Sequence, residues 1–108
     1  LLTSTPRQLL LYRALGLTAP EFAHVPLVVG EDGRRLAKRH GDTRLSAMRD
    51  ADVPAENLLG LLGWSCGWLA KPEPITAKEL IPRFDLNAIP KEPFVLTRES
   101  LRAIGFGG

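Results

Sequence analysis

A dense group of cationic side chains occupies one short stretch of the sequence: Arg34, Arg35, Lys38, Arg39 and Arg44. The whole chain carries a formal net charge of only +2, so this positive charge is local and not part of a generally basic surface. One interpretation is a solvated turn. The other is an anion site, because a lysine ammonium is a compact point charge and arginines hold phosphate through paired donors.

The residues between the charges favour the anion site. Leu36 and Ala37 interrupt the cationic run, so an apolar side chain can hold the segment against the protein while Lys38 and Arg39 project from it. Flanking glycines allow the backbone to approach a ligand closely. A segment of this kind suits a polyphosphate.

Composition excludes several classes of site. A chain of 108 residues with 44% hydrophobic content is sufficient for one compact domain. The single cysteine, Cys66, excludes an internal disulfide, and with only His24 and His40 as further strong ligands a structural zinc site cannot be assembled. Apolar runs are too short for a membrane span of roughly 20 residues. We therefore expect a cytoplasmic protein without a zinc site, and the opening Leu1 suggests that the chain is part of a longer one.

Local signals in the first third predict a helix and a strand. Thr5 and Gln8 are spaced as a capping box with Pro6 at the first helical position, so a helix should run to about residue 15 and stop at Gly16. Residues 24–29 are a β-branched run that predicts a strand, followed by a turn at 31–33. This strand is expected to pair with residues 34–36 as a hairpin, to complete a sheet supplied by other sequence, or both.

The remaining elements are expected to be helical. Asp42 or Thr43 could cap a helix carrying Leu45 and Met48, and residues 54–64 read as a helix that is apolar on most sides and lies at the centre of the core. Residues 76–79 form a capping box for a short helix ending near Pro82, and residues 97–105 predict a last helix. The fold class expected is mainly α with one or two short strands (α+β).

Two segments carry a resemblance to a known family. Residues 24–27 (HVPL) followed by 33–41 (GRRLAKRHG) resemble the second signature, called KMSKS, of class I aminoacyl-tRNA synthetases in the glutamyl and glutaminyl branch. The STPRQ run at 4–8 and the helix expected at 54–64 also resemble that family. The resemblance implies that residues 1–45 end a Rossmann-type catalytic core with the KMSKS-like loop, and that residues 46–108 form a helical region similar to the one that contacts the tRNA stem.

The resemblance also implies roles for individual residues. Lys38 matches the second lysine of the signature, which stabilises the triphosphate while the amino-acid carboxylate attacks the α-phosphorus, so Lys38 is the catalytic candidate. Arg35 replaces the first lysine, keeping its charge with a different shape, and Ala37 replaces the usual serine. Residues expected to contact ATP are Val25, Leu27, Arg35, Leu36, Ala37, Lys38 and Arg39. ATP with Mg²⁺, glutamate and tRNA are the partners implied.

Other residues remain open between two interpretations. His40 could contact phosphate or simply be an exposed loop histidine, and Arg7 could face nucleic acid or solvent. His24 has no assignment. Cys66, Trp64 and Trp68 are expected to be core residues and not reactive or base-stacking groups.

The resemblance leaves part of a synthetase unaccounted for. The first signature of the family, HIGH, does not occur in the sequence, so this chain alone is not expected to catalyse. The GDTRLS run at 41–46 and the short stretch after residues 85–90 look more like the glutamyl-queuosine tRNA(Asp) synthetases than the conventional glutamyl-tRNA synthetases. A conventional enzyme is one alternative, and a free-standing, non-catalytic nucleotide- or RNA-binding module is another.

Overall fold

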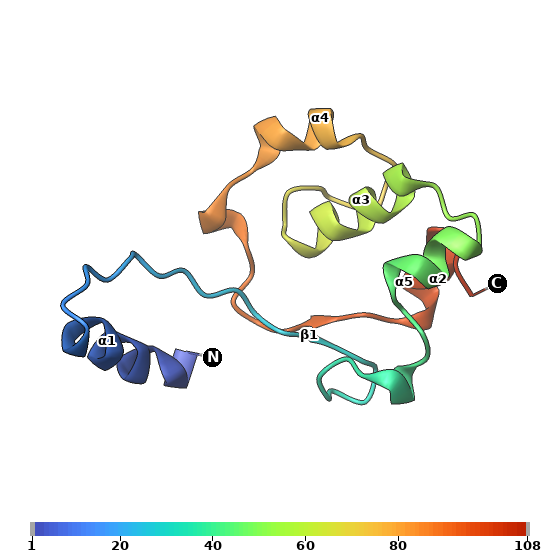
Figure 1. Cartoon of the computed structure of the whole chain (residues 1–108). Coiled ribbons are helices and arrows are strands. Elements are labelled where there is room, and N and C mark those ends of the chain that lie inside the picture. Colours follow the sequence, from blue (N-terminus) through green and yellow to red (C-terminus); the bar gives the residue numbers. More distant parts are fainter. Residues whose placement is uncertain (1, 108) are drawn as a thin grey trace.

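The computed structural model describes residues 2–107 and is mainly helical, with one pair of two-residue strands (Figure 1). The expected fold class is confirmed. In chain order, the elements after a first 3-10 turn are α1 (Thr5–Ala14), β1 (Val28–Val29), the 3-10 turn η2 (Lys38–His40), α2 (Leu45–Asp50), α3 (Ala55–Ser65), α4 (Ala77–Leu80), η3 (Ile81–Arg83), η4 (Leu86–Ala88), β2 (Phe94–Val95) and α5 (Arg98–Ala103).

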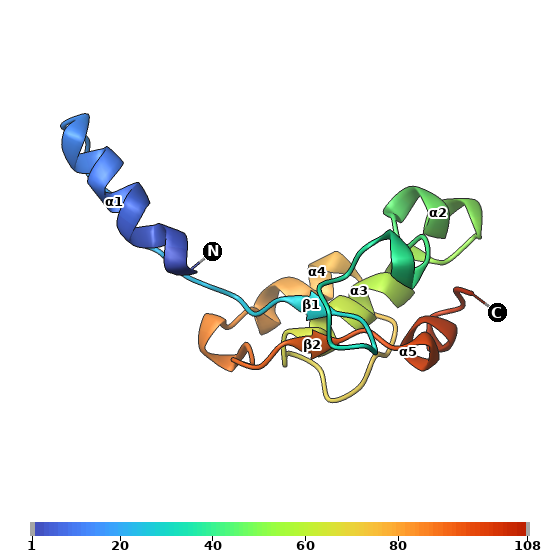
Figure 2. The ribbon, with the colours of Figure 1, turned by 90° about the horizontal axis from the view of Figure 1, so that it is seen from below.

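Helix α1 projects away from the rest of the chain on an extended connection (Figures 1 and 2). Its leucines are solvent-exposed, with Leu10 at 63% and Leu11 at 59%. The radius of gyration is 16.8 Å, against about 13 Å for a compact domain of roughly 100 residues. The apolar residues of α1 are therefore not covered by the described part of this chain.

The expected capping box at the start of α1 is wrong. Ser4 is the N-cap residue and makes no side-chain capping bond, and Thr5 is already helical. The Thr5 hydroxyl instead lies 3.2 Å from Nε2 of His24. The expected end is confirmed, because Gly16 follows the helix with a φ of 68°, in the left-handed region that favours glycine.

Strand β1 is shorter than the expected strand at 24–29. Pro26 lacks the N–H that a ladder requires, and the residues that precede Val28 run as extended chain outside a sheet. The expected hairpin is confirmed in part, since Val29 forms an isolated antiparallel bridge with Arg35. On its other side β1 pairs in parallel with β2, with Val28 opposite Phe94, a pairing that the sequence did not predict (Figure 2).

Helix α3 lies in the middle of the body, as expected, with α4 and the connecting segments around it (Figure 1). Its Leu61 is buried and Leu62 is exposed, so not every apolar side chain of this helix faces the core. Gly60 and Gly63 are buried and allow close packing, as expected. The buried apolar side chains among the described residues are Val29, Met48, Leu61, Leu69, Ile75 and Ile104.

Helix ends farther along the chain follow the sequence signals with one exception. Thr76 and Glu79 form the expected capping box, and Thr97 caps α5 by accepting from the Ser100 N–H at 3.0 Å. The expected caps of α2 are wrong, because Arg44 is its N-cap residue and makes no side-chain capping bond. Asp42 instead accepts from the backbone N–H of the N-cap residue Arg44 at 3.1 Å, two residues too early to cap the helix.

Candidate functional site

The basic loop, residues 33–41, begins inside a tight hairpin that follows β1. The Gly33 N–H donates to the Gly30 carbonyl at 3.0 Å, and the Gly30 N–H donates to the Arg34 carbonyl at 2.8 Å. The Leu36 N–H then donates to the Val28 carbonyl at 3.1 Å. Because β1 is held on its other side by β2, the first half of the basic loop is attached to the core.

The second half of the basic loop is the turn η2, which two reciprocal hydrogen bonds close. The His40 N–H donates to the Ala37 carbonyl at 2.9 Å, and the Ala37 N–H donates to Nδ1 of His40 at 3.0 Å. Gly41 follows with a φ of 94°, a conformation that favours glycine. Lys38 is the first residue of this closed turn, and its side chain is exposed.

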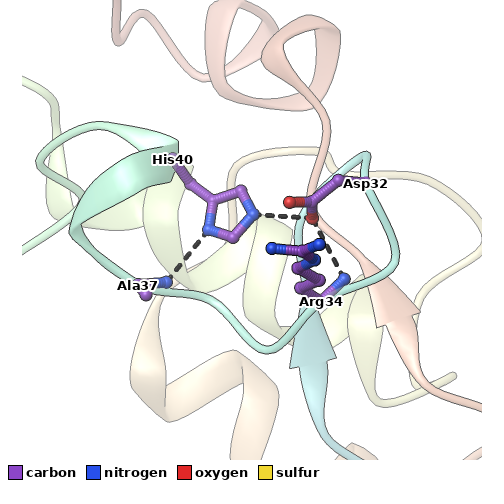
Figure 3. Close-up of polar contacts among 4 residues, drawn as sticks. All are labelled: Asp32, Arg34, Ala37 and His40. Atoms are coloured by element: carbon purple, nitrogen blue, oxygen red, sulfur yellow. Dashed lines mark hydrogen bonds and ion pairs between the residues drawn. The ribbon is translucent and has the colours of Figure 1, made fainter.

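The side chain of His40 joins the turn η2 to Asp32, which lies in the hairpin just before the basic loop (Figure 3). Its Nε2 lies 2.7 Å from Oδ1 of Asp32, which also accepts from the backbone N–H of Arg34 at 3.0 Å. Only 13% of the His40 side chain is exposed, and the ring packs against the α-carbon of Gly30. The interpretation of His40 as an exposed loop histidine is therefore wrong.

An open depression lies on the surface beside the turn. Its volume is about 570 Å³, within the range of ligand sites. The residues that line it are Leu36, Ala37, Lys38, Gly41, Asp42, Thr43 and Arg44. The fold thus brings three of the predicted ATP-contacting residues to one concave surface, together with a second cation, Arg44.

Arg44 is held at this depression by a two-point ion pair with Asp42. Its Nε donates to Oδ1 at 2.9 Å and its Nη2 donates to Oδ2 at 2.8 Å. These bonds lower the pKa of Asp42 from 3.8 to about 2 and raise that of Arg44. From the sequence, Arg44 was expected to be one of the local cations but not part of the ATP site; its place within three residues of Gly41 was the available signal.

The other predicted contact residues are placed differently. Val25 and Leu27 lie on the extended segment before β1, are 65% and 54% exposed, and do not line the depression. Arg35 is exposed and bridges to Val29 in the hairpin. The side chain of Arg39 lies outside the described part of the structure.

The tryptophans, Cys66 and Arg7 lie outside the depression. Trp64 packs edge-on against Phe94, with ring centroids 5.4 Å apart, and Trp68 donates from Nε1 to the Asp85 carbonyl at 2.9 Å. Cys66 ends α3 and is partly exposed. Arg7 is exposed on α1.

Residues 2–107 contain no group of three or more His, Cys, Asp or Glu side chains that could hold a metal ion. None of the helices formed by these residues is long and apolar enough to cross a membrane.

The mainly helical fold with two short strands is consistent with part of a class I synthetase catalytic domain. Residues 1–103 match the family described as tRNA synthetases class I (E and Q), catalytic domain. The chain belongs to this family, which confirms the resemblance.

Curated relatives fall into two groups. The chain is 50% identical over 107 residues to a glutamyl-Q tRNA(Asp) synthetase of Symbiobacterium thermophilum, an alignment that covers 99% of the chain and 33% of that protein. It is 44% identical over 104 residues to a glutamyl-Q tRNA(Asp) synthetase of Rhodopirellula baltica, covering 89% and 32%. It is 42% identical over 106 residues to a glutamate–tRNA ligase of Carboxydothermus hydrogenoformans, covering 95% and 22%. The chain thus spans between about a fifth and a third of the length of these relatives.

Proposed function

We propose that this chain is part of a parent enzyme that activates glutamate with ATP as the adenylate and transfers it to queuosine in tRNA(Asp). The parent enzyme would be a class I aminoacyl-tRNA synthetase-like ligase acting in the cytoplasm. The observation that carries the proposal is the 50% identity to a glutamyl-Q tRNA(Asp) synthetase over 99% of the chain.

Lys38 is the catalytic residue in this proposal. It is the exposed lysine of a turn that is closed by backbone and side-chain bonds, so its backbone position is defined before a ligand arrives. As glutamate attacks the α-phosphorus of ATP, negative charge builds up on the phosphate oxygens and on the departing pyrophosphate. A positioned ammonium stabilises this charge more in the transition state than in the ground state, which is the requirement for catalysis.

The remaining residues of the basic loop bind ATP in this proposal. Leu36 and Ala37 line the depression with Lys38, while Arg35 and Arg39 add positive charge along the phosphates. Arg44 supplies a further cation, partly neutralised by Asp42. Val25 and Leu27 lie along the adenine on the segment leading into β1. Mg²⁺ is expected to enter on the ATP phosphates, which are ligands it prefers.

Two regions with different tasks follow from this assignment. Residues 1–45 close the nucleotide-binding core and present the basic loop. Residues 46–108, built around α3, contact the tRNA stem. The parallel pairing of β1 with β2 supports a fixed relation between the two regions, since β1 belongs to the first and β2 to the second.

The acceptor is tested by labelling. The parent enzyme is incubated with ATP, labelled glutamate and tRNA from queuosine-containing and queuosine-deficient cells. We expect label only on tRNA(Asp) that contains queuosine, with the 3′ end of that tRNA uncharged. Equal labelling of both tRNA preparations, or label on tRNA(Glu), would reject the proposal.

A conventional glutamate–tRNA ligase is the second candidate. Relatives with that name are 45% and 46% identical to the chain, close to the values for the first group. The same experiment separates the two, because a conventional ligase would esterify the 3′ end of tRNA(Glu) and would be indifferent to queuosine. A non-catalytic binding module would label neither tRNA.

A further inference from the structure

We propose that His40 is a positioning residue that holds the turn carrying Lys38 in its reactive arrangement. This inference rests on the proposed function, in which Lys38 stabilises the transition state. It assigns to His40 no contact with ATP. Its role is to connect the backbone of the turn to the hairpin that is anchored on β1 (Figure 3).

The hydrogen bonds define the protonation of the imidazole. A backbone N–H can only donate, so Nδ1 of His40 accepts from Ala37 and carries no proton. The neutral ring then bears its proton on Nε2, which donates to Oδ1 of Asp32 at 2.7 Å. The two ring nitrogens have different partners, Ala37 in the turn and Asp32 just before the basic loop, and together these partners fit this one tautomer.

The imidazole of His40 does not line the depression proposed to bind ATP. Its ring packs over Gly30, where any Cβ would collide with the imidazole, and it faces Asp32. The depression lined by Ala37 and Lys38 does not include His40. The ring therefore supports the turn without lining the depression proposed to bind ATP.

Loss of the imidazole would free the turn at both points. The Ala37 N–H would lose its partner, and the link from η2 to Asp32 would be broken. Only the backbone bonds from His40 to Ala37 and from Gly41 to Lys38 would then close the turn. Residues 38–39 would then sample several arrangements. The rate would then fall to the intrinsic rate multiplied by the fraction of molecules in which Lys38 is correctly placed.

The test measures single-turnover formation of glutamyl adenylate by the parent enzyme. We expect His40→Ala to reduce the rate at saturating ATP about tenfold, the order expected for the loss of one or two hydrogen bonds that fix a catalytic group. His40→Asn retains an acceptor near the position of Nδ1 and should recover part of the loss. Lys91→Ala, which removes an exposed charge outside the basic loop, serves as the control and should not change the rate.

The combination with Lys38→Ala distinguishes positioning from general structural support. If His40 acts through Lys38, adding His40→Ala to Lys38→Ala should change the rate less than twofold. A full tenfold loss in both backgrounds, or an unchanged rate in the single variant, would overturn the proposal.

Nuclear magnetic resonance of the ¹⁵N-labelled histidines gives a readout that needs no activity. We expect a protonated Nε2 and an unprotonated Nδ1 for His40. The Ala37 amide should exchange faster in His40→Asn than in the unaltered enzyme, because its hydrogen bond to residue 40 is weakened. If the enzyme forms no glutamyl adenylate, the proposed function fails. The tautomer of His40 can still be measured in that case, and it tests the hydrogen bonds by which His40 holds the turn. A protonated Nδ1 with an unprotonated Nε2 would overturn the inference in either case.

Discussion

Gly60, in the middle of α3, packs directly against the backbone carbonyl of Glu73. A Cβ built on Gly60 would collide with that carbonyl oxygen. The segment that contains Glu73 is also tied to α3 by the Ile75 N–H, which donates to the Glu56 carbonyl at 3.1 Å. The helix and the following segment are therefore in backbone contact, and a glycine is required between them.

Gly60→Ala is predicted to destabilise the protein by about 1–3 kcal/mol. Alanine improves helix propensity by about 1 kcal/mol, but overpacking against a backbone that is itself hydrogen-bonded costs more. Gly63→Ala is the matched control, because its Cβ would meet only the side-chain ends of Leu80 and Leu69, at 3.0 and 3.1 Å, which can shift. Urea unfolding measures both variants. A Gly60→Ala protein at least as stable as Gly63→Ala would contradict the prediction.

Thr97→Ala is predicted to lower the free energy of unfolding by about 1 kcal/mol, the usual cost of losing an N-cap. The Thr97 hydroxyl accepts from the Ser100 N–H and also lies 2.8 Å from the Ser100 hydroxyl, which is itself buried. Thr97→Ser keeps both contacts and should unfold close to the unaltered protein. Equal losses for the two variants would show that the methyl group, and not the cap, matters.

The carboxyl of Asp42 is predicted to titrate near pH 2 because Arg44 donates side-chain and backbone bonds to it. A folded-state pKa below the ordinary value of 3.8 means that the stabilisation is present above about pH 4 and is lost as the pH falls through about 2. Arg44→Gln should return the pKa toward 3.8. A ¹³C NMR titration of the carboxyl checks this, and an Asp42 that already titrates near 4 in the unaltered protein would rule it out.

Lys38→Ala in the parent enzyme is predicted to slow adenylate formation roughly a hundredfold or more, the effect of removing one positioned donor from a transition state. Lys38→Arg should recover only part of the rate, since a planar guanidinium does not replace a compact ammonium. Single-turnover kinetics with ATP and glutamate measure the step. An unchanged rate for the alanine variant would reassign the basic loop to binding.

The isolated chain of residues 1–108 is predicted to show no ATP–pyrophosphate exchange with glutamate. Stabilising the transition state needs donors on both sides of the phosphate, and here the assigned donors come from one loop. The exposed leucines of α1 should also make the isolated chain self-associate. Exchange assays beside the parent enzyme, and size-exclusion chromatography, test the two expectations. Robust exchange by a monomeric fragment would refute both.

Local signals were sufficient for most helix ends. Thr76, Thr97, Gly16 and Gly105 act through their own backbone neighbours, so their type and spacing alone predict a cap or a stop. The cap predicted at Thr5 failed because the preceding turn already has helical geometry and the hydroxyl is used by His24, a contact between residues far apart in the sequence.

The position of the candidate site could also be predicted from the sequence, because four cationic residues lie between two glycines within one short segment. The sequence alone determined that a lysine lies in a tight basic turn and which family it resembles. The tertiary structure alone decided that β1 pairs with β2, that the leucines of α1 remain uncovered, and that His40 reaches Asp32 and not solvent. These three outcomes depend on which surfaces meet in space, and residue type and local spacing do not specify a partner that lies elsewhere in the chain.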